Sequence, residues 1–339
     1  MIINKNVSLK KFNTFGLNYV ADCFIHLKSV KEAQAIFNGT YSYKKPLLII
    51  GGGSNILFTG DFRGTIIHPE IKGIKLGKEE ANTVLVSAGA DVSWDQFVQW
   101  CVDRGYSGVE NLSLIPGSVG ASVVQNIGAY GVEVKDLIEK IKAVNINDGS
   151  IRIFKNDECE FGYRSSIFKK KLKGKYLIVK VYYRLTINPI LKLDYGSLNE
   201  EIKKLGEPSI SNVRDAVINI RRSKLPDPDL IGNAGSFFKN PVVIDTQAMR
   251  LLKKFPEMPQ YTYAPGFKKL AAGWMIDKCG WKGKRIGDAG VHDKQALVIV
   301  NHGKATGKEI YELSELVRRS VYDKFDVNLE REVEVIGVI

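Results

Sequence analysis

The sequence has little histidine and little cysteine, four residues of each among 339. The cysteines (Cys23, Cys101, Cys159 and Cys279) are scattered, and no two have the spacing of a zinc site or of a redox Cys-x-x-Cys motif. We therefore expect four free thiols, no metal centre and a reducing compartment.

Long apolar runs are also missing. No stretch of about eighteen apolar residues occurs, so no membrane span is expected. The residues after Met1 do not form the apolar core of a signal peptide, and a cytoplasmic protein is expected. The sequence shows no internal repeat and no low-complexity segment.

Acidic residues are outnumbered, with 37 Asp and Glu against 49 Lys and Arg, for a net charge of +12. Such a charge attracts phosphates, nucleotides or nucleic acid. A lysine-rich solvated surface is the alternative, because the densest basic run, 169–175, reads as a loop between strands. No aromatic platform of the single-strand-binding type accompanies that run, so no nucleic-acid partner is expected.

A chain of this length predicts two or three domains. Helices are expected after the capping boxes at Ser29, Ser93 and Thr306, and over 212–222, whose last turn holds Arg221 where the helix dipole favours a cation. The apolar residues of each helix share one face: Ala33, Ile36 and Phe37; Trp94, Phe97 and Cys101; Val213, Ala216, Val217 and Ile220; Ile310, Leu313, Val317 and Val321. Strands are expected at 46–50, 56–58, 84–88, 176–185 and 329–336, with further strands between 138 and 154. The strand over 176–185 places alternate residues on one face, namely Leu177, Val179, Val181, Tyr183 and Leu185. Residues 106–131 and 186–212 show little regular pattern.

Ser236 follows a small, flexible Asn-Ala-Gly run within Gly232–Pro241. A hydrolytic nucleophile would need a Gly-x-Ser-x-Gly elbow or a nearby base, yet no such elbow is present and the nearest histidine in sequence is His292. This serine is therefore expected where a ligand or cofactor touches the backbone, and not as a hydrolase nucleophile.

Two glycine-rich segments stand about sixty residues apart. Gly51–Asn55 follows an apolar strand, and its consecutive glycines allow backbone N–H groups to converge on an anion; a plain turn between strands is the alternative. It is neither a Walker motif nor the dinucleotide Gly-x-Gly-x-x-Gly. The second segment, Ile115–Gly131, is too rich in glycine and small hydroxyl residues to build a core. The pair suits a flat ligand that has both a diphosphate and a ring system.

With these segments in view, the sequence resembles the UDP-N-acetylenolpyruvoylglucosamine reductases of bacterial cell-wall synthesis, type I. The matching motifs occur in the family's order over nearly the whole chain: Asn13–Gly16, Gly51–Asn55, Ile115–Ala121, Gln125–Gly131, Phe161–Ser165, Ser223–Pro228, Gly232–Pro241, Ala272–Trp274, His292–Val298 and Leu329–Val333. The resemblance implies an α+β fold, with a two-part FAD-binding module of the vanillyl-alcohol-oxidase type and a separate α+β substrate-binding domain.

The resemblance also implies domain limits and ligands. The FAD-binding parts are expected at 1–70 and 71–212, the latter completed by 329–339, and the substrate domain at 213–328. FAD and NADPH are the implied cofactors and a UDP-sugar the substrate, handled by a monomer. The implied FAD contacts are Gly51, Gly52, Gly53, Ser54, Asn55, Ile115, Pro116, Gly117, Ser118, Gly120, Ala121, Ser122, Asn126, Gly128, Ala129 and Tyr130.

Three positions match the family's catalytic residues. Arg164 would hold the substrate carboxylate and stabilise the enolate formed after hydride transfer, with Glu332 assisting. Ser236 would then protonate the neighbouring carbon, which explains why no histidine is required. On the residues alone, Arg164 reads equally as a surface arginine or an ion-pair partner, and Glu332 as one of three solvated carboxylates on a strand.

Substrate contacts follow from the same resemblance. Lys224, Asn240 and Gln295 would meet the diphosphate, and Tyr195 lies on a loop typical of type I members, although a plain turn is the alternative there. Tyr261 or Tyr263 would contact the nucleotide. Two rival functions remain open: a flavin oxidase of the same superfamily that acts on a sugar alcohol or lactone, and a non-catalytic nucleotide-binding protein.

Overall fold

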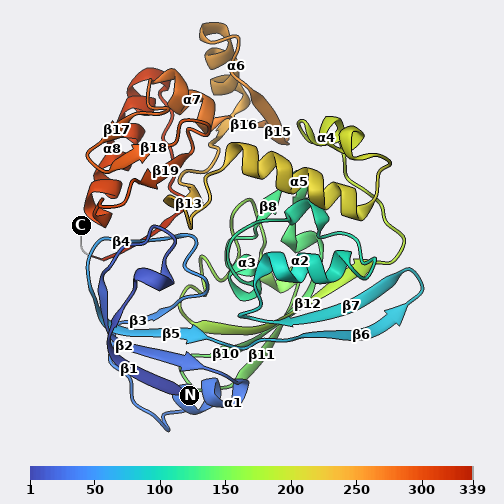
Figure 1. The fold of residues 1–339 in the computed structure, drawn as a ribbon, viewed down its shortest axis with the longest axis vertical. Coiled ribbons are helices and arrows are strands. Elements are labelled where there is room, and N and C mark those ends of the chain that lie inside the picture. Colours follow the sequence, from blue (N-terminus) through green and yellow to red (C-terminus); the bar gives the residue numbers. More distant parts are fainter. Residues whose placement is uncertain (338–339) are drawn as a thin grey trace. The chain divides into compact units, whose positions relative to one another are not determined.

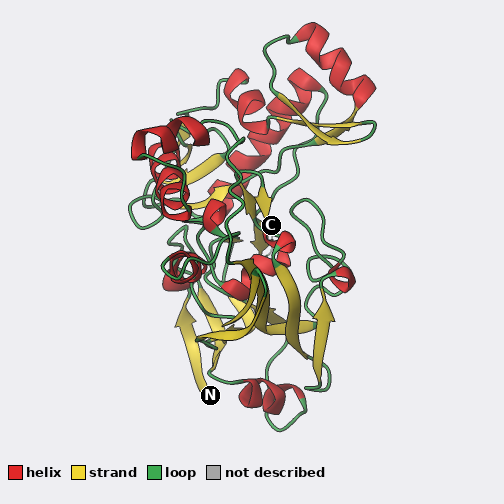
Figure 2. Cartoon of the chain, turned by 90° about the vertical axis from the view of Figure 1, so that its right-hand side faces the viewer, coloured by secondary structure: helices red, strands yellow, loops and turns green. Residues whose placement is uncertain are grey.

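The computed structural model describes residues 1–337 and divides into two compact units. The first unit contains Met1–Val7, Ala21–Gly53 and Arg63–Ser223; the second contains Ser8–Val20, Ser54–Phe62 and the chain from Lys224 on. Strands and helices occur throughout both (Figures 1 and 2), as the expected α+β class requires. The three-domain division expected from the sequence stays a prediction.

The first unit begins with a four-stranded sheet in the order β1-β2-β5-β3, in which β3 and β5 run parallel. Its strands are β1 (Ile2–Ser8), β2 (Val20–Leu27), β3 (Leu47–Ile49) and β5 (Phe62–Pro69). Helix α1 (Val30–Phe37) starts where the Ser29 hydroxyl accepts a hydrogen bond from the Glu32 amide. The predicted apolar face of this helix, Ala33, Ile36 and Phe37, is buried as expected.

A five-stranded antiparallel sheet, β11-β10-β12-β7-β6, forms the rest of the first unit's framework. Its strands are β6 (Ile74–Glu80), β7 (Thr83–Gly89), β10 (Ile138–Asn145), β11 (Ile151–Lys155) and β12 (Tyr176–Thr186). The predicted inward face of β12 is fully buried at Leu177, Val179, Val181, Tyr183 and Leu185. Helix α2 (Trp94–Val102) buries Trp94, Phe97 and Cys101 in the core shared with this sheet.

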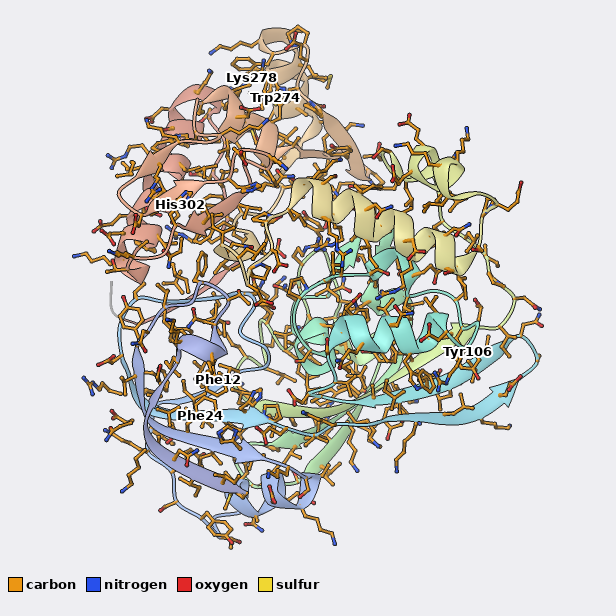
Figure 3. The ribbon with its side chains drawn as sticks, in the orientation of Figure 1. Phe12, Phe24, Tyr106, Trp274, Lys278 and His302 are labelled. Atoms are coloured by element: carbon orange, nitrogen blue, oxygen red, sulfur yellow. The ribbon has the colours of Figure 1, made fainter. Side chains whose placement is uncertain are left out.

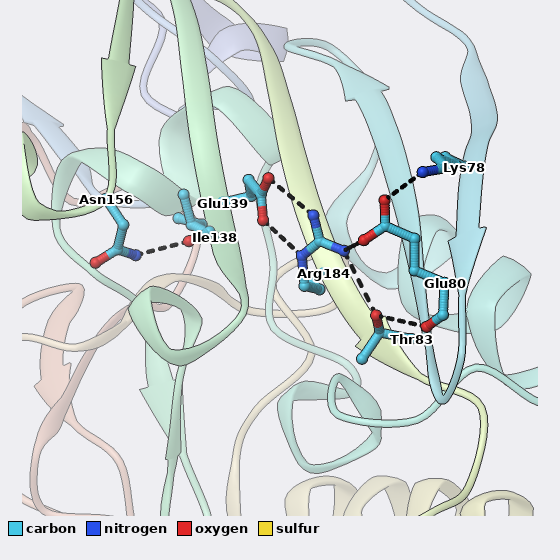
Figure 4. A network of polar contacts seen from close by, with 7 residues as sticks. All are labelled: Lys78, Glu80, Thr83, Ile138, Glu139, Asn156 and Arg184. Atoms are coloured by element: carbon cyan, nitrogen blue, oxygen red, sulfur yellow. Dashed lines mark hydrogen bonds and ion pairs between the residues drawn. The ribbon is translucent and has the colours of Figure 1, made fainter.

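An ion-pair network also joins β10 and β12 to β6, across the intervening strand β7 (Figure 4). Arg184 on β12 donates to both carboxylate oxygens of Glu139 on β10, at 2.6 and 2.9 Å, and its Nη1 lies 3.3 Å from Glu80 at the end of β6. Lys78 pairs with Glu80 at 3.0 Å. Because these side chains are partly exposed, the network stabilises the strand order only modestly.

Two helices occur where the sequence predicted irregular chain. Helix α3 (Val119–Val124) lies inside 106–131, and α4 (Leu198–Leu205) lies inside 186–212. Both are short, and their glycines, turn residues and charges obscure the helical period. Helix α4 buries Leu198 and Ile202 against α5 (Ile210–Lys224), whose predicted inner face is confirmed at Val213, Ala216, Val217 and Ile220.

The second unit contains two further sheets, in the orders β13-β19-β18-β17 and β14-β16-β15. The strands are β13 (Gly232–Ser236), β14 (Val242–Ile244), β15 (Gln260–Ala264), β16 (Phe267–Leu270), β17 (Arg285–Ile286), β18 (Ala289–Val291) and β19 (Val298–Asn301). The helices are α6 (Asp245–Lys254), α7 (Ala272–Lys278) and α8 (Gly307–Phe325). Figure 3 labels Trp274 and Lys278 on α7. The Lys278 ammonium lies 5.3 Å from the centroid of the Trp274 ring.

Helix α8 confirms its predicted start and apolar stripe. Thr306 and Glu309 form a complete capping box, and Ile310, Leu313, Val317 and Val321 are buried. The helix packs in the same hydrophobic core of the second unit as Phe237 and Phe238.

The strand expected over 329–336 is shorter than predicted. Only β20 (Glu334–Ile336) is a regular strand, and it pairs in parallel with β4 (Ile56–Phe58). Residues 330–332 instead bond to the segment after β13, through Lys239 to Glu330 and through Glu332 to Phe237, with one isolated bridge between Phe238 and Arg331. The segment 330–336 therefore pairs with two different partners, first with residues 237–239 and then with β4. The alternation of Glu and Val does not show where one pairing ends and the other begins.

All four cysteines are free, as expected. Burial raises the pKa of the Cys101 thiol and raises that of Cys159 to about 12, so both remain protonated near neutral pH. Within residues 1–337, none of the helices combines the length and the apolar character needed to cross a bilayer.

Candidate functional site

The two glycine-rich segments meet in the first unit. A Cβ atom on Gly51 would lie 2.7 Å from the Ser118 hydroxyl oxygen, and one on Gly52 would lie 3.3 Å from the Cα of Gly117. Ser118 precedes α3, and its side chain makes no capping hydrogen bond to that helix. Two backbones thus approach without side chains between them, as a loop around a flat, charged ligand requires.

Helix α3 is held from beneath by the loop after β7. The Val119 amide donates to the Val92 carbonyl, and the Gly120 amide donates to the Ala90 carbonyl, both at 2.9 Å. A Cβ atom on Gly120 would lie 2.8 Å from the Cβ of Ala90, so this position admits only glycine without a shift. The Ser122 hydroxyl donates a hydrogen bond to the Val119 carbonyl of the same helix.

Asn126 connects the second glycine-rich segment to the loop that carries Arg164. Its side-chain amide donates to Glu133 and to the Gly162 carbonyl, both at 2.9 Å, and its oxygen accepts from the Lys135 amide. The residue is fully buried, with a positive φ of 48°. These bonds make Asn126 a positioning residue whose side chain is occupied by the protein.

Arg164 lies at the tip of a tight turn in which Gly162 and Ser165 exchange two backbone hydrogen bonds of 3.0 Å. Its φ of 51° is uncommon for a residue with a side chain. One guanidinium nitrogen donates to the Gly128 carbonyl at 2.6 Å, and the other lies 3.0 Å from where a Gly128 Cβ would stand. The turn therefore presses the guanidinium against the second glycine-rich segment.

Arg221 is a candidate site residue that the sequence analysis missed, because its place in the last turn of α5 suggested only a favourable helix-dipole contact. It is largely buried, and its Nε donates to the Leu114 carbonyl at 3.3 Å. Burial lowers the pKa of this guanidinium, Tyr130 and Asp95 oppose that effect, and Arg164 adds to it. Helical spacing could have indicated its burial, since Arg221 lies four residues after Val217 and eight after Val213, on the same buried face of α5.

Tyr195 packs against the same segment. Its ring meets that of Tyr130 edge to face, with centroids 6.0 Å apart, and it remains about half exposed. The buried Asn111 side chain donates to the carbonyls of both Tyr130 and Lys192, at 2.9 and 2.8 Å. Burial raises the pKa of the Tyr130 phenol, which therefore stays neutral. Asn111 thus fixes the loop before Tyr195 to the glycine-rich segment.

The second unit brings Ser236, Glu332 and Asn55 together through the backbone. Ser236 ends β13 just after Gly235, whose φ is 66°. The Glu332 amide donates to the Phe237 carbonyl at 2.9 Å. The Asn55 side chain donates to the Glu332 carbonyl at 3.0 Å, and the Glu334 amide donates back to the Asn55 carbonyl.

The expected substrate contacts of the second unit have defined surroundings. The Asn240 side-chain oxygen accepts from the Ala272 amide at 3.0 Å, which turns its NH₂ group outward from that bond. The Gln295 side-chain oxygen would lie 3.1 Å from a Cβ on Gly273, so glycine there makes room for it. Lys224 is exposed at the end of α5.

Tyr261 and Tyr263 are both exposed on β15, and the Lys269 ammonium lies 5.9 Å from the Tyr261 ring. Of the sequence-derived residues, Arg164 and Tyr195 thus belong to the first unit, and Ser236, Glu332, Lys224, Asn240 and Gln295 to the second. Among residues 1–337, His, Cys, Asp and Glu side chains nowhere gather in a group of three that could hold a metal ion.

Two family models match the chain. One, described as an FAD binding domain, covers residues 21–155. The other, described as the C-terminal domain of UDP-N-acetylenolpyruvoylglucosamine reductase, covers residues 227–336. A protein of Flavobacterium johnsoniae with that reductase name is 46% identical over 339 residues, covering 99% of this chain and 100% of the relative. The chain belongs to the UDP-N-acetylenolpyruvoylglucosamine reductase family.

Other members agree with this assignment. The reductase of Pseudomonas aeruginosa is 46% identical over 97% of this chain and 98% of its own length. The crystal structure of the reductase from Thermus caldophilus, at 24% identity, superposes with a TM-score of 0.69 over 99% of this chain and 100% of that chain. The resemblance stated from the motifs is confirmed, as is the α+β fold with its FAD-binding part.

Proposed function

We propose that this chain is an FAD-dependent enzyme that uses NADPH to reduce UDP-N-acetylenolpyruvoylglucosamine to UDP-N-acetylmuramate, a step of peptidoglycan precursor synthesis. The observation that carries the proposal is the end-to-end match to reductases of that name, with the FAD binding domain over residues 21–155. The rival functions find no comparable support.

The residues of the first unit suit FAD. Where Gly51 and Gly52 approach Gly117 and Ser118, a Cβ would collide with the opposing segment, so only glycine lets the two backbones come this close. Backbone amides in such a cradle bind a diphosphate without a charged side chain. Bound there, FAD would supply the hydride for the substrate; all remaining steps fall to groups of the chain itself.

Arg164 has the properties of an anion-binding group. It is permanently charged, and its contact with the Gly128 carbonyl sets the direction of the guanidinium fork. We assign it to the substrate carboxylate and to the negative charge that develops beside it. Arg221, buried in the same unit and sensing the charge of Arg164, adds positive potential.

We assign the proton transfer to Ser236. A serine hydroxyl is a weak acid, but an enolate carbon is a strong base, so position matters more than a shifted pKa. The end of β13 and the bond between Phe237 and Glu332 fix the backbone on both sides of this hydroxyl. Glu332 would assist at the carboxylate in its protonated form.

The UDP-sugar would be held by Lys224, Asn240 and Gln295 at its diphosphate and by Tyr195 from the first unit. For the nucleotide we assign Tyr261 or Tyr263, both exposed on β15; at Tyr261 the Lys269 ammonium lies over the ring, which provides an aromatic face and a cation together. The same proposal includes a monomeric state. It also includes a cytoplasmic location, which the free thiols suggest.

The optical spectrum of the purified protein tests this proposal first. The protein should carry FAD or take it up after reconstitution, and NADPH should bleach the flavin band. A protein that never binds FAD would support the nucleotide-binding rival. A flavin that reacts rapidly with oxygen, and with no enolpyruvyl sugar, would support the oxidase rival.

A further inference from the structure

The first unit contains a histidine and an aspartate that lie beneath both glycine-rich segments and have no part in the proposed chemistry. His68 is the penultimate residue of β5, and Asp91 follows the end of β7. The His68 Nδ1 lies 3.2 Å from the Ile50 carbonyl oxygen, and its Nε2 lies 3.6 Å from a carboxylate oxygen of Asp91. Both side chains are mostly buried, at 12% and 16% exposure.

Each end of this pair contacts one wall of the cradle. Ile50 directly precedes Gly51, and its amide donates to the Ile67 carbonyl of β5. The contact with His68 engages the Ile50 carbonyl, so both backbone polar groups of Ile50 have partners. Asp91 stands between Ala90 and Val92, the two residues whose carbonyls accept the first amides of α3. A change in the pair therefore reaches both Gly51 and Gly120.

Both contacts of His68 favour a protonated pair. A neutral imidazole carries one N–H, so one of its nitrogens would direct a lone pair at an oxygen, either the Ile50 carbonyl or the Asp91 carboxylate. An imidazolium donates to the Ile50 carbonyl and attracts the Asp91 carboxylate across 3.6 Å, an ion-pair distance longer than a hydrogen bond. A proton on Asp91 likewise removes the repulsion between the Nε2 lone pair and the carboxylate, so one proton on the pair strengthens the contact whichever residue carries it.

The charged groups around the pair come from β2 and from the loop that follows β5. Lys72 lies 3.9 Å from the second carboxylate oxygen of Asp91, and Glu70 is bound to His26 at 2.7 Å. His26, on β2 beside Phe24 (labelled in Figure 3), meets the His68 ring edge-on at 6.2 Å. Burial raises the pKa of the Asp91 carboxyl, His68 and Lys72 oppose this, and Glu70 adds to it.

We propose that His68 and Asp91 are positioning residues that share a proton and thereby hold the two glycine-rich segments at the spacing FAD requires. FAD binding is then tighter when the pair is protonated and weakens as pH rises and the proton is lost. This inference rests on the proposed function, since it concerns the affinity of the same cradle for FAD.

The test is a titration of the flavin-free protein with FAD between about pH 5 and pH 9, the range in which histidine changes charge. Wild-type protein should lose about three- to tenfold in affinity across the range, which corresponds to about 0.6–1.4 kcal/mol. His68→Gln and Asp91→Asn should bind FAD with a flat profile. His302→Gln, which alters an exposed histidine of the second unit, should follow wild type.

A flat wild-type profile, or a wild-type profile in both variants, would overturn the inference while leaving the FAD site intact. Absence of FAD binding at every pH would instead overturn the proposed function. Should the variants fail to fold, ¹⁵N spectra of the wild-type imidazoles decide: FAD should raise the pH at which the His68–Asp91 pair loses its proton. A neutral imidazole throughout, or a titration unmoved by FAD, contradicts the inference.

Discussion

The main-chain amide of Glu332 donates a hydrogen bond of 2.9 Å to the carbonyl of Phe237, the residue that follows Ser236. Two positions almost a hundred residues apart are thereby fixed in one backbone arrangement. The side chain of Asn55 extends it by donating to the Glu332 carbonyl. A proton donor that lacks an activating base depends on such fixed geometry, because position replaces a shifted pKa.

Ser236→Ala should separate the two half-reactions. Flavin reduction by NADPH should stay near wild type, while reoxidation by the enolpyruvyl sugar should slow by roughly a hundred- to ten-thousandfold, the span of a general acid. Stopped-flow absorbance of the flavin measures both. Ser320→Ala, which removes an exposed hydroxyl of α8, is the control. Equal damage to both half-reactions would make Ser236 structural.

Lys224→Ala should chiefly raise KM for the UDP-sugar, because a lysine that meets the diphosphate contributes to binding before and during the reaction alike. Steady-state kinetics with varied UDP-sugar at saturating NADPH provide the measurement. Lys253→Ala, at an exposed lysine near the end of α6, should leave both parameters unchanged. A fall in kcat at constant KM would contradict the assigned role.

Arg221→Ala and Arg222→Ala form a matched pair of neighbours on α5. Arg221 is largely buried and bonded to the Leu114 carbonyl, whereas Arg222 is exposed. Loss of Arg221 should slow reoxidation by the substrate by about tenfold or more, as for removal of one electrostatic group near developing charge. Loss of Arg222 should have no effect on rapid-reaction kinetics. Equal behaviour of the two variants would remove Arg221 from the site.

The ion pair of Asp95 and Arg214 should make stability depend on pH. Arg214 is 6% exposed, donates to both Asp95 oxygens at 2.7 and 2.9 Å, and joins α5 to α2. Burial favours the neutral Asp95 carboxyl, but Arg214 and the Leu114 amide outweigh it and lower its pKa. The stabilisation is thus present above the usual pKa of aspartate and is lost as pH falls through the lowered value.

Asp95→Asn should therefore cost about 3 kcal/mol at neutral pH, because it leaves a buried guanidinium without its partner. Asp326→Asn, in an exposed pair with Arg250, should cost less than about 1 kcal/mol. Urea unfolding at pH 7 and pH 3 measures both. The difference between wild type and Asp95→Asn should shrink at pH 3; a constant difference would show that the carboxylate charge has no part.

The sequence predicted those elements whose local pattern agrees with their tertiary environment. The Thr306 capping box and the apolar stripe of α8 appear in the structure as expected, and so does the buried face of β12. The short helices α3 and α4 were not predicted, because each is too brief to show a helical period. The closing strand was predicted too long, because only its last residues pair with β4 and the earlier ones bond to the segment after Ser236.

The site was predicted unevenly for a similar reason. The family motifs named Arg164, Ser236 and Glu332, but no local pattern distinguishes a buried arginine such as Arg221 from a surface one at a helix end. His68 and Asp91 lie twenty-three positions apart in unremarkable strand ends, and only the fold brings them together. Burial and long-range contacts decide these roles, and both are properties of the packed chain.

A single-turnover experiment distinguishes the proposed reductase from both rival functions. The FAD-loaded protein is reduced with one equivalent of NADPH without oxygen and then mixed with UDP-N-acetylenolpyruvoylglucosamine. We expect the flavin to reoxidise and one UDP-N-acetylmuramate to form per flavin, while UDP-N-acetylglucosamine should leave the flavin reduced. Reoxidation without that product, or no reoxidation at all, would contradict the proposed function.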